Sequence, residues 1–200
     1  MATRTVRYPS LMDAVWPGVS AARDVVLVTG GSLAIALSAQ LAIPLPFTPV
    51  PITAQTLAVG LIGALFGARR GAATVALYLA EGAIGLPVFA QGAAGIAKFM
   101  GPTAGYLAGF LASAFVVGRL CEMGWGRRFW TAAAALALGD LTVHLYGLAW
   151  LSSFDGFETA LKLGFYPFIP GNIIKIIVGA SLLPGGWRLI RRLGLAQPGL

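Results

Sequence analysis

Two polar residues at the start of the last apolar segment carry the clearest chemical signal in the sequence. Asn172 and Lys175 lie three residues apart, so they share one face of a helix. Pro170 and Gly171 precede them and are typical of a helix start, where free backbone N–H groups favour an anion. The Lys175 ammonium suits a carboxylate, and the Asn172 amide can donate to and accept from an amide or urea group. The alternative is structural, with Lys175 extending to a polar surface and Asn172 capping the helix.

Five further residues could line the same site. Lys98 lies in a glycine-flanked break before an apolar segment, where the alternative is an interfacial anchor. Gln55 opens the second apolar segment and Gln91 lies in a glycine-rich stretch, and each could instead serve as a cap or backbone partner. Tyr106 and Tyr146 could stack on a ring-shaped ligand, although most such aromatic residues belong to a core or to an interface belt.

A second group of ionisable residues keeps an enzyme hypothesis open. Asp140 and His144 are four residues apart and can pair, as a proton relay or, more simply, as a structural hydrogen bond. Glu81 has no obvious partner along the sequence. The chain contains no G-x-x-x-x-G-K-[ST] or G-x-S-x-G motif, and its one histidine and one cysteine cannot form a His-rich or Cys-rich metal site. We therefore predict no metal site and no cofactor, and the leading hypothesis has no catalytic residue.

The composition places these residues in a membrane protein. Of 200 residues, 58% are hydrophobic and 10% charged, whereas soluble chains are roughly 45–50% apolar and about 25% charged. The 14 basic and 7 acidic side chains cannot cover the water-facing surface of a soluble domain of this size. The net charge of +7 comes from basic loops, as in membrane proteins, and does not indicate a nucleic-acid partner.

Six apolar segments, divided by prolines, glycines and charges, predict six transmembrane helices. The run 25–68 carries no charge and is divided between Pro44 and Pro51, where four prolines in eight residues cannot lie inside a helix. Irregular, glycine-rich backbone is expected at 88–103. The predicted spans are 25–43, 53–67, 71–86, 104–120, 129–151 and 171–190. The expected fold class is an all-α integral membrane protein with six transmembrane helices and irregular outer loops.

The basic residues predict the orientation of the chain. Six spans put both termini on one side, and that side then holds all the basic residues except Lys98, Lys162 and Lys175. By the positive-inside rule both termini are cytoplasmic, in a multi-pass protein of the plasma (inner) membrane. Cleavage of the first span as a signal peptide is disfavoured, because the apolar run continues into further spans. The expected division is a cytoplasmic segment 1–24, a transmembrane substrate-binding domain 25–192 and a cytoplasmic tail 193–200.

Small residues recur on the first predicted span. Gly30, Ala34 and Ser38 repeat every four residues, a spacing that lets two helix backbones approach closely. The stripe could pack within this chain or form a docking face for another membrane protein. We predict the partner interface here.

Four sequence blocks follow one another in order: PLPFTPVPITAQTLAV (44–59), GAIGLPVFA (82–90), GPTAGYLAGF (101–110) and FYPFIPGNIIK (165–175). Together they resemble BioY, the family of biotin-binding S components of energy-coupling-factor transporters. The resemblance implies a six-helix protein that binds biotin near the outer surface, with the first loop as a lid. It also implies a transmembrane T component and two cytoplasmic ATPases as partners, with the small residues of the first span facing the T component.

The resemblance also assigns residues to the biotin site. Gln55 matches the glutamine of the PIT-x-QT block, and Lys98 matches the basic residue before the GPT block. Asn172 and Lys175 match the polar residue and the lysine of the PG-x-x-x-K block. The family commonly carries aspartate at the first of these positions and arginine in place of Lys98, whose ammonium lacks the planar guanidinium fork. Because an aspartate could pair with Lys175, we predict that Asn172→Asp retains biotin binding.

Three hypotheses of function follow from the sequence. The leading one is a substrate-capture subunit for biotin uptake, with biotin, a T component, ATPases and the lipid bilayer as partners and no nucleic acid. The second is an intramembrane enzyme that acts on a small carboxylated substrate through Asp140, His144 and Glu81. The third is an assembly protein whose small-residue stripe is its main purpose.

Overall fold

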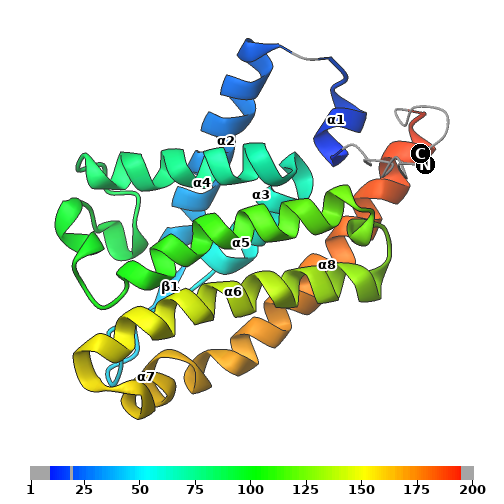
Figure 1. The fold of residues 1–200 in the computed structure, drawn as a ribbon. Helices are drawn as coiled ribbons and strands as arrows, with labels where there is room; N and C mark the ends of the chain where they lie inside the picture. The colour runs from blue at the N-terminus through cyan, green and yellow to red at the C-terminus, as the bar shows by residue number, and fades with distance from the viewer. Residues whose placement is uncertain (1–9, 19, 195–200) are drawn as a thin grey trace, which may run out of the picture.

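The structure is a computed structural model that describes residues 10–18 and 20–194, and over these ranges the chain forms a bundle of α-helices (Figure 1). The all-helical architecture expected from the sequence is confirmed. The helices of the bundle are α1 (Leu11–Val15), α2 (Ala21–Gln40), α3 (Gln55–Phe66), α4 (Ala68–Ala83), α5 (Ala104–Glu122), α6 (Phe129–Asp155), α7 (Phe157–Gly164) and α8 (Ile169–Arg192).

Four helical segments in the described part of the chain are long and apolar enough to cross a membrane. They are Ala21–Gln40, Ala104–Glu122, Phe129–Asp155 and the run Phe157–Arg192. The predicted spans 53–67 and 71–86 correspond to α3 and α4, which have 12 and 16 residues. At 1.5 Å per residue these helices are only about 18 and 24 Å long, against about 30 Å for a hydrocarbon core.

The connections between helices are where the chain departs from regular structure. The proline-rich segment joins two short antiparallel strands, β1 (Ala42–Ile43) and β2 (Ile52–Thr53). The glycine-rich segment before α5 forms two 3-10 turns, η1 (Ala90–Gly92) and η2 (Ile96–Phe99), as the expectation of irregular backbone required. Two further 3-10 turns, η3 (Trp125–Arg127) and η4 (Tyr166–Phe168), precede α6 and α8.

Helix α7 was not anticipated from the sequence. Its charges interrupt the apolar run, and an exposed Glu158–Lys162 ion pair, with Oε1 and Nζ 2.7 Å apart, covers one face of the helix. Ala160 and Gly164 are buried on the other face. A short amphipathic helix of this kind carries too few apolar residues to be read as a span.

Glycines set the close packing of α5 against α6. A Cβ added at Gly105 would lie 2.4 Å from the Tyr146 carbonyl oxygen, and one added at Gly109 would lie 2.9 Å from the Cα of Val143. From the other side, a Cβ at Gly147 would lie 2.3 Å from the Tyr106 ring. This contact fixes the rotation of the two helices about their axes, because backbone meets backbone at Gly105 and Gly109 and the Tyr106 ring fills the space left at Gly147.

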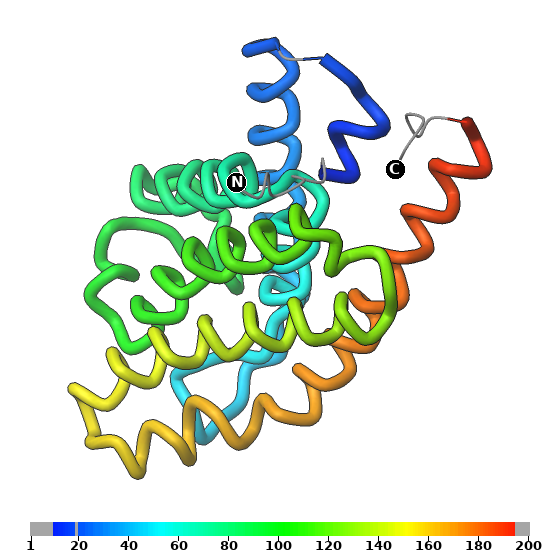
Figure 2. Tube along the Cα trace, turned by 45° about the vertical axis from the view of Figure 1, so that its right-hand side comes forward, coloured from blue at the N-terminus to red at the C-terminus, as the bar shows by residue number. Residues whose placement is uncertain are grey.

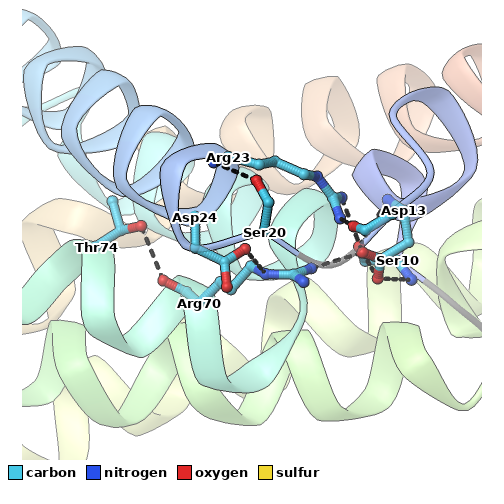
Figure 3. A network of polar contacts seen from close by, with 8 residues as sticks. Ser10, Asp13, Ser20, Arg23, Asp24, Arg70 and Thr74 are labelled. Carbon is cyan, nitrogen blue, oxygen red and sulfur yellow. Dashed lines mark hydrogen bonds and ion pairs between the residues drawn. The ribbon is translucent and has the colours of Figure 1, made fainter.

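Charged residues tie α1 to the bundle (Figure 3). The Asp13 carboxylate accepts from Arg23 at 2.9 Å and from Arg70 at 2.6 Å, and the Arg70 Nε lies 2.8 Å from Asp24. Burial raises the pKa of Asp13, but hydrogen bonds from Ser10 and both arginines outweigh it, so the pKa lies below its ordinary value. The ion pairs therefore join α1 to the first turns of α2 and α4.

Different structural elements lie at the two ends of the bundle. Leu11 and Ala14 of α1 pack on Trp187 and Ile190, so α1 and the last turns of α8 lie at one end, called here the α1 end. Figures 1 and 2 place α7 and the connection between β1 and β2 at the opposite end, called here the β end.

Candidate functional site

A cavity of about 380 Å³ lies toward the β end of the bundle. Its walls come from the β1–β2 connection, the irregular loop before α5, and helices α3, α5, α6 and α8. The volume falls within the roughly 300–1,000 Å³ of typical small-molecule sites. Six of the seven residues predicted to bind a ligand line it: Gln55, Gln91, Lys98, Tyr106, Asn172 and Lys175.

Tyr146, the seventh predicted residue, does not line this cavity. Its side chain is 50% exposed on the outside of the bundle. Val143, His144 and Gly147 are the buried positions on this part of α6, so the residue between them points away from the core. The helical period that directs His144 inward thus directs Tyr146 outward.

A polar cluster closes the deep side of the cavity. The Lys175 ammonium donates to the Thr56 hydroxyl at 3.0 Å and to the Asn172 Oδ1 at 3.4 Å. The Asn172 Nδ2 donates to the Asp140 Oδ2 at 3.0 Å and lies 3.4 Å from the His144 Nε2. The Asn172 side chain is buried, with 6% exposed. Residues from three helices therefore meet here, although Thr56 lies 119 positions before Lys175 and Asp140 lies 32 positions before Asn172.

This geometry does not match the structural alternative given for the α8 pair, a capping asparagine and a lysine that extends to the surface. Asn172 and Lys175 lie on one face of α8, as their spacing predicts. The Asn172 side chain makes its contacts with α6 and Lys175 and does not cap α8. Lys175 bonds inward to α3 and does not extend along the surface. Both side chains are thus directed to the cavity wall.

Gln55 and Tyr106 line the cavity, and the Gln55 Nε2 and the Tyr106 hydroxyl are already bonded to the protein. The Gln55 Nε2 donates to the Tyr78 hydroxyl at 2.6 Å. The Tyr106 hydroxyl donates to the Gly164 carbonyl oxygen at 2.9 Å, and its ring lies edge to face with His144, 6.1 Å between centroids. Tyr106 therefore offers an apolar ring surface to a ligand rather than a hydroxyl.

The rim of the cavity holds the two remaining predicted residues. Gln91 and Lys98 are both exposed, on η1 and η2. Gln91 has φ 61°, in the left-handed region that non-glycine residues seldom adopt. Its loop is held by Gln40, whose Nε2 donates to the Phe89 carbonyl oxygen at 3.2 Å and whose Oε1 accepts from the Gly92 N–H at 3.1 Å.

The β1–β2 connection covers the remaining side of the cavity. Pro49, Val50 and Pro51 line it, and Val50 is buried. The Thr48 hydroxyl donates to the Leu163 carbonyl oxygen at 2.7 Å, which fastens the connection to α7. The segment that the resemblance assigns to a lid thus forms one wall of the cavity.

Sequence reasoning missed part of the cavity lining. Thr56 bonds Lys175 directly, yet nothing distinguishes its hydroxyl from others in an apolar segment. His144 was considered only as a relay or a structural partner, although it lines the cavity. Phe110 and Phe168 add apolar wall. The aromatic residues could have been found only as members of a buried face, which the sequence does not distinguish from ordinary core.

The small-residue stripe faces outward. Gly30 and Ala34 are exposed, and a Cβ added at Gly30 would meet no atom within 4 Å. Ser38 is partly buried and donates to the carbonyl oxygen of Ile35 in its own helix at 2.6 Å. The inward face of α2 carries other residues, including the buried Ser32. Among the described residues, the Gly30 and Ala34 part of the stripe therefore faces away from the other helices of this chain.

The three residues of the enzyme hypothesis do not meet. The Ser32 hydroxyl donates to the Glu81 carboxylate, which joins α2 to α4. Asp140 and His144 lie instead beside Asn172, and Glu81 does not line the cavity. The structure therefore does not assemble a site from all three.

Comparison with known proteins gives one family. The BioY family model matches residues 8–192. The biotin transporter BioY of Rhizobium etli is 40% identical over 169 residues, which cover 80% of this chain and 90% of that protein. The biotin transporter BioY of Rhodobacter capsulatus is 42% identical over 162 residues, covering 74% and 83%. A crystal structure of the S-component for biotin from an ECF-type ABC transporter superposes with a TM-score of 0.77 at 28% identity, covering 87% of this chain and 95% of that one.

Proposed function

The chain belongs to the BioY family, and we propose that it is the S component that captures biotin for an energy-coupling-factor transporter. The observation that carries the proposal is the cavity of about 380 Å³ with a cation at its rim and an amide–ammonium cluster at its deep side. Biotin has the matching groups, since it carries a carboxylate at one end and a urea ring at the other. The family consists of transporter components rather than enzymes, so we assign no catalytic residue.

We propose that the urea ring of biotin enters first. Asn172 and Lys175 lie at the deep side of the cavity. Desolvating an uncharged urea group there costs less free energy than desolvating a carboxylate. Lys98 is exposed at the rim, so it can hold the carboxylate while both remain partly hydrated. The Tyr106 ring and the phenylalanines of the wall cover the apolar part of the ligand. In this arrangement Gln55 contacts the ligand from the wall of the cavity, and Gln91 contacts it from the rim.

We propose that α3 and α4 complete six transmembrane crossings, with both termini in the cytoplasm. Arg23 and Arg70 lie at the α1 end, while Lys98 and Lys162 lie at the β end. An excess of arginine at one end supports a cytoplasmic α1 end by the positive-inside rule. The cavity then faces the outside, from which biotin is taken up. The protein works in the plasma (inner) membrane, and the spans lie within the substrate-binding domain 25–192.

We propose that the outward stripe of α2 docks a transmembrane T component, which couples the chain to cytoplasmic ATPases. Gly30 and Ala34 are exposed and lie against no helix of this chain in the described ranges. A face without bulky side chains permits close approach of a partner helix within the bilayer. The cavity lies on the other side of α2, toward its β end, so docking leaves the ligand contacts in place.

Binding of biotin and of its neutral methyl ester tests the proposal. The purified chain in lipid nanodiscs should bind biotin and release it chemically unchanged, as mass spectrometry of the bound ligand would show. Lys98→Ala should weaken biotin by about two- to fivefold, because an ion pair at the exposed rim is lost. The same substitution should leave the methyl ester nearly unaffected, since that ligand carries no carboxylate.

Lys162→Ala is the matched control, because Lys162 is an exposed lysine of α7 that does not line the cavity. It should bind both ligands as the parent does. Absence of biotin binding by the folded parent chain would refute the proposed function. An equal loss for both ligands in Lys98→Ala would refute only the placement of the carboxylate.

A further inference from the structure

We propose that Asp140 and His144 are positioning residues that fix the Asn172 amide so that it presents only its carbonyl oxygen to the ligand. Asn172 then takes the part of the aspartate that is common at this position in the BioY family. The inference rests on the proposed function, because it concerns how the urea N–H of biotin is recognised.

The His144 ring has a defined hydrogen arrangement. Its Nδ1 lies 2.9 Å from the backbone carbonyl oxygen of Asp140 and 3.4 Å from the carboxylate Oδ2 of the same residue. Both of these atoms are acceptors, so Nδ1 carries the hydrogen and donates it. In the neutral ring the Nε2, which lies 3.4 Å from the Asn172 Nδ2, has a free lone pair and accepts an NH₂ hydrogen.

The charges on its two sides fix the Asn172 amide. The Nδ2 lies 3.0 Å from the Asp140 carboxylate, and the Oδ1 lies 3.4 Å from the Lys175 ammonium. Turning the amide over would put its oxygen against the carboxylate and its NH₂ against the ammonium, two repulsive contacts in a buried place. The observed orientation is therefore the stable one, and the amide cannot adapt to the ligand as a free asparagine would.

The hydrogen-bond inventory then leaves Asn172 as an acceptor. An amide NH₂ has two hydrogens, and here one goes to Asp140 and the other to His144. Its oxygen has two lone pairs, of which Lys175 takes one. The remaining lone pair suits a urea N–H. The Lys175 ammonium, bonded to Thr56 and Asn172, keeps its third hydrogen for the urea carbonyl oxygen.

Asp140 contacts the Asn172 amide and not the main cavity, so it acts on the ligand only through Asn172. It does not line the main cavity, but with Ser113 and Thr56 it borders a second, small space of about 20 Å³, enough for about one water molecule. Its carboxylate also balances the charge of Lys175 in the membrane, as an aspartate at position 172 would in the family. In this chain the carboxylate beside the Asn172–Lys175 pair thus stands on α6 and not on α8.

A charge exchange between the two positions tests this inference. Asn172→Asp puts a second carboxylate at the place of the Nδ2, 3.0 Å from the Asp140 oxygen, and should lower biotin affinity by at least about tenfold. This differs from the retained binding predicted from the sequence, which paired Asp140 with His144 and did not place it against Asn172. Adding Asp140→Asn to Asn172→Asp should restore affinity to within about threefold of the parent. Asp140→Asn alone should cost about three- to tenfold, because the Asn172 amide is then free to turn.

An analogue that replaces both urea N–H groups with oxygen, a cyclic carbonate, separates positioning from general stability. The parent should prefer biotin over this analogue by about 100-fold or more, because an acceptor cannot bond to a ring oxygen. Asp140→Asn should reduce the preference, since the freed amide can donate to that oxygen. A purely structural role would instead weaken both ligands equally and leave the preference unchanged.

The outcomes are distinct from those of the proposed function. Parent-like affinity of Asn172→Asp, or a double variant no better than Asn172→Asp, would overturn the inference although biotin binding itself stands. If the parent binds no biotin, the thermal unfolding midpoints of the four ligand-free chains still test whether the Asp140 carboxylate holds the Asn172 amide. Asn172→Asp should lower the midpoint and the double variant should restore it, and additive effects would overturn the inference.

Discussion

Replacing Lys175 with methionine tests the deep side of the cavity most directly. Methionine keeps an unbranched apolar stem of similar length and removes the ammonium, so the packing of α8 is little changed. In the parent, the ammonium donates to Thr56 and Asn172 and has one hydrogen left for a ligand. Asn172 keeps its contacts with α6 in the variant. The substitution therefore removes one ligand contact and leaves the remaining wall in place.

The expected loss follows from the kind of contact that is removed. A hydrogen bond from a charged donor contributes about 1.5–3 kcal/mol in a buried site. At 1.4 kcal/mol for each factor of ten, biotin should bind about 10- to 150-fold more weakly to Lys175→Met. The loss should appear mainly as faster dissociation, because the residue lies deep in the cavity and acts after the ligand has entered.

Equilibrium and kinetic binding of labelled biotin to the chain in nanodiscs would measure both quantities. Lys162→Met is the control of the same chemistry, because the Lys162 side chain is 64% exposed and paired with Glu158 on α7. It should bind biotin within about twofold of the parent, since exposed ion pairs contribute little. Affinity of a folded Lys175→Met within threefold of the parent would refute the role of Lys175. An equal loss in both variants would point to the overall charge of this end of the protein instead.

Three further predictions concern the partner face, the orientation and the α1 network. Ala34→Trp should keep biotin binding but block assembly with the T component. Leu145→Trp, on the exposed face of α6, should affect neither biotin binding nor assembly. Loss of biotin binding in Ala34→Trp would show that the stripe packs within this chain. In a cysteine-free background, Arg69→Cys should stay unlabelled by an impermeant maleimide applied outside cells, while Glu158→Cys should be labelled. The reverse labelling pattern would show that the chain crosses the membrane in the opposite orientation. Because the pKa of Asp13 is lowered from its ordinary 3.8, its contribution to stability is complete above that pH and is lost as pH falls through the lowered pKa. The thermal midpoint of the parent should thus fall more steeply below about pH 4 than that of Asp13→Asn, and parallel curves would contradict the ion-pair account.

Much of the candidate site could be predicted from the spacing of residues in the sequence. Asn172 and Lys175 lie on one face because three residues make nearly one helical turn, and this holds wherever the helix packs. The proline-rich and glycine-rich segments had to interrupt the helices, since proline lacks the backbone donor and blocks the preceding turn. These segments cover and border the cavity in the structure. Composition alone was enough to place the chain in a membrane.

The rotation of each helix about its axis was not encoded in local spacing. Tyr106 and Tyr146 are equal as aromatic residues in apolar segments, but only Tyr106 faces the cavity. The contact of Gly105 with α6 sets this difference, because close backbone approach allows only one pair of faces to meet. The outward direction of Gly30 and Ala34 depends in the same way on which face of α2 packs on the bundle.

The partner of Asn172 could come only from the tertiary structure. Asp140 lies 32 residues earlier on another helix, and from the sequence it was paired with His144 alone. Periodicity relates residues within one helix, whereas a contact between α6 and α8 depends on the packing of the whole bundle. The sequence therefore determined that an amide and an ammonium stand side by side. Only the fold decided which atom of the amide is free to meet a ligand, because a carboxylate from α6 holds the other.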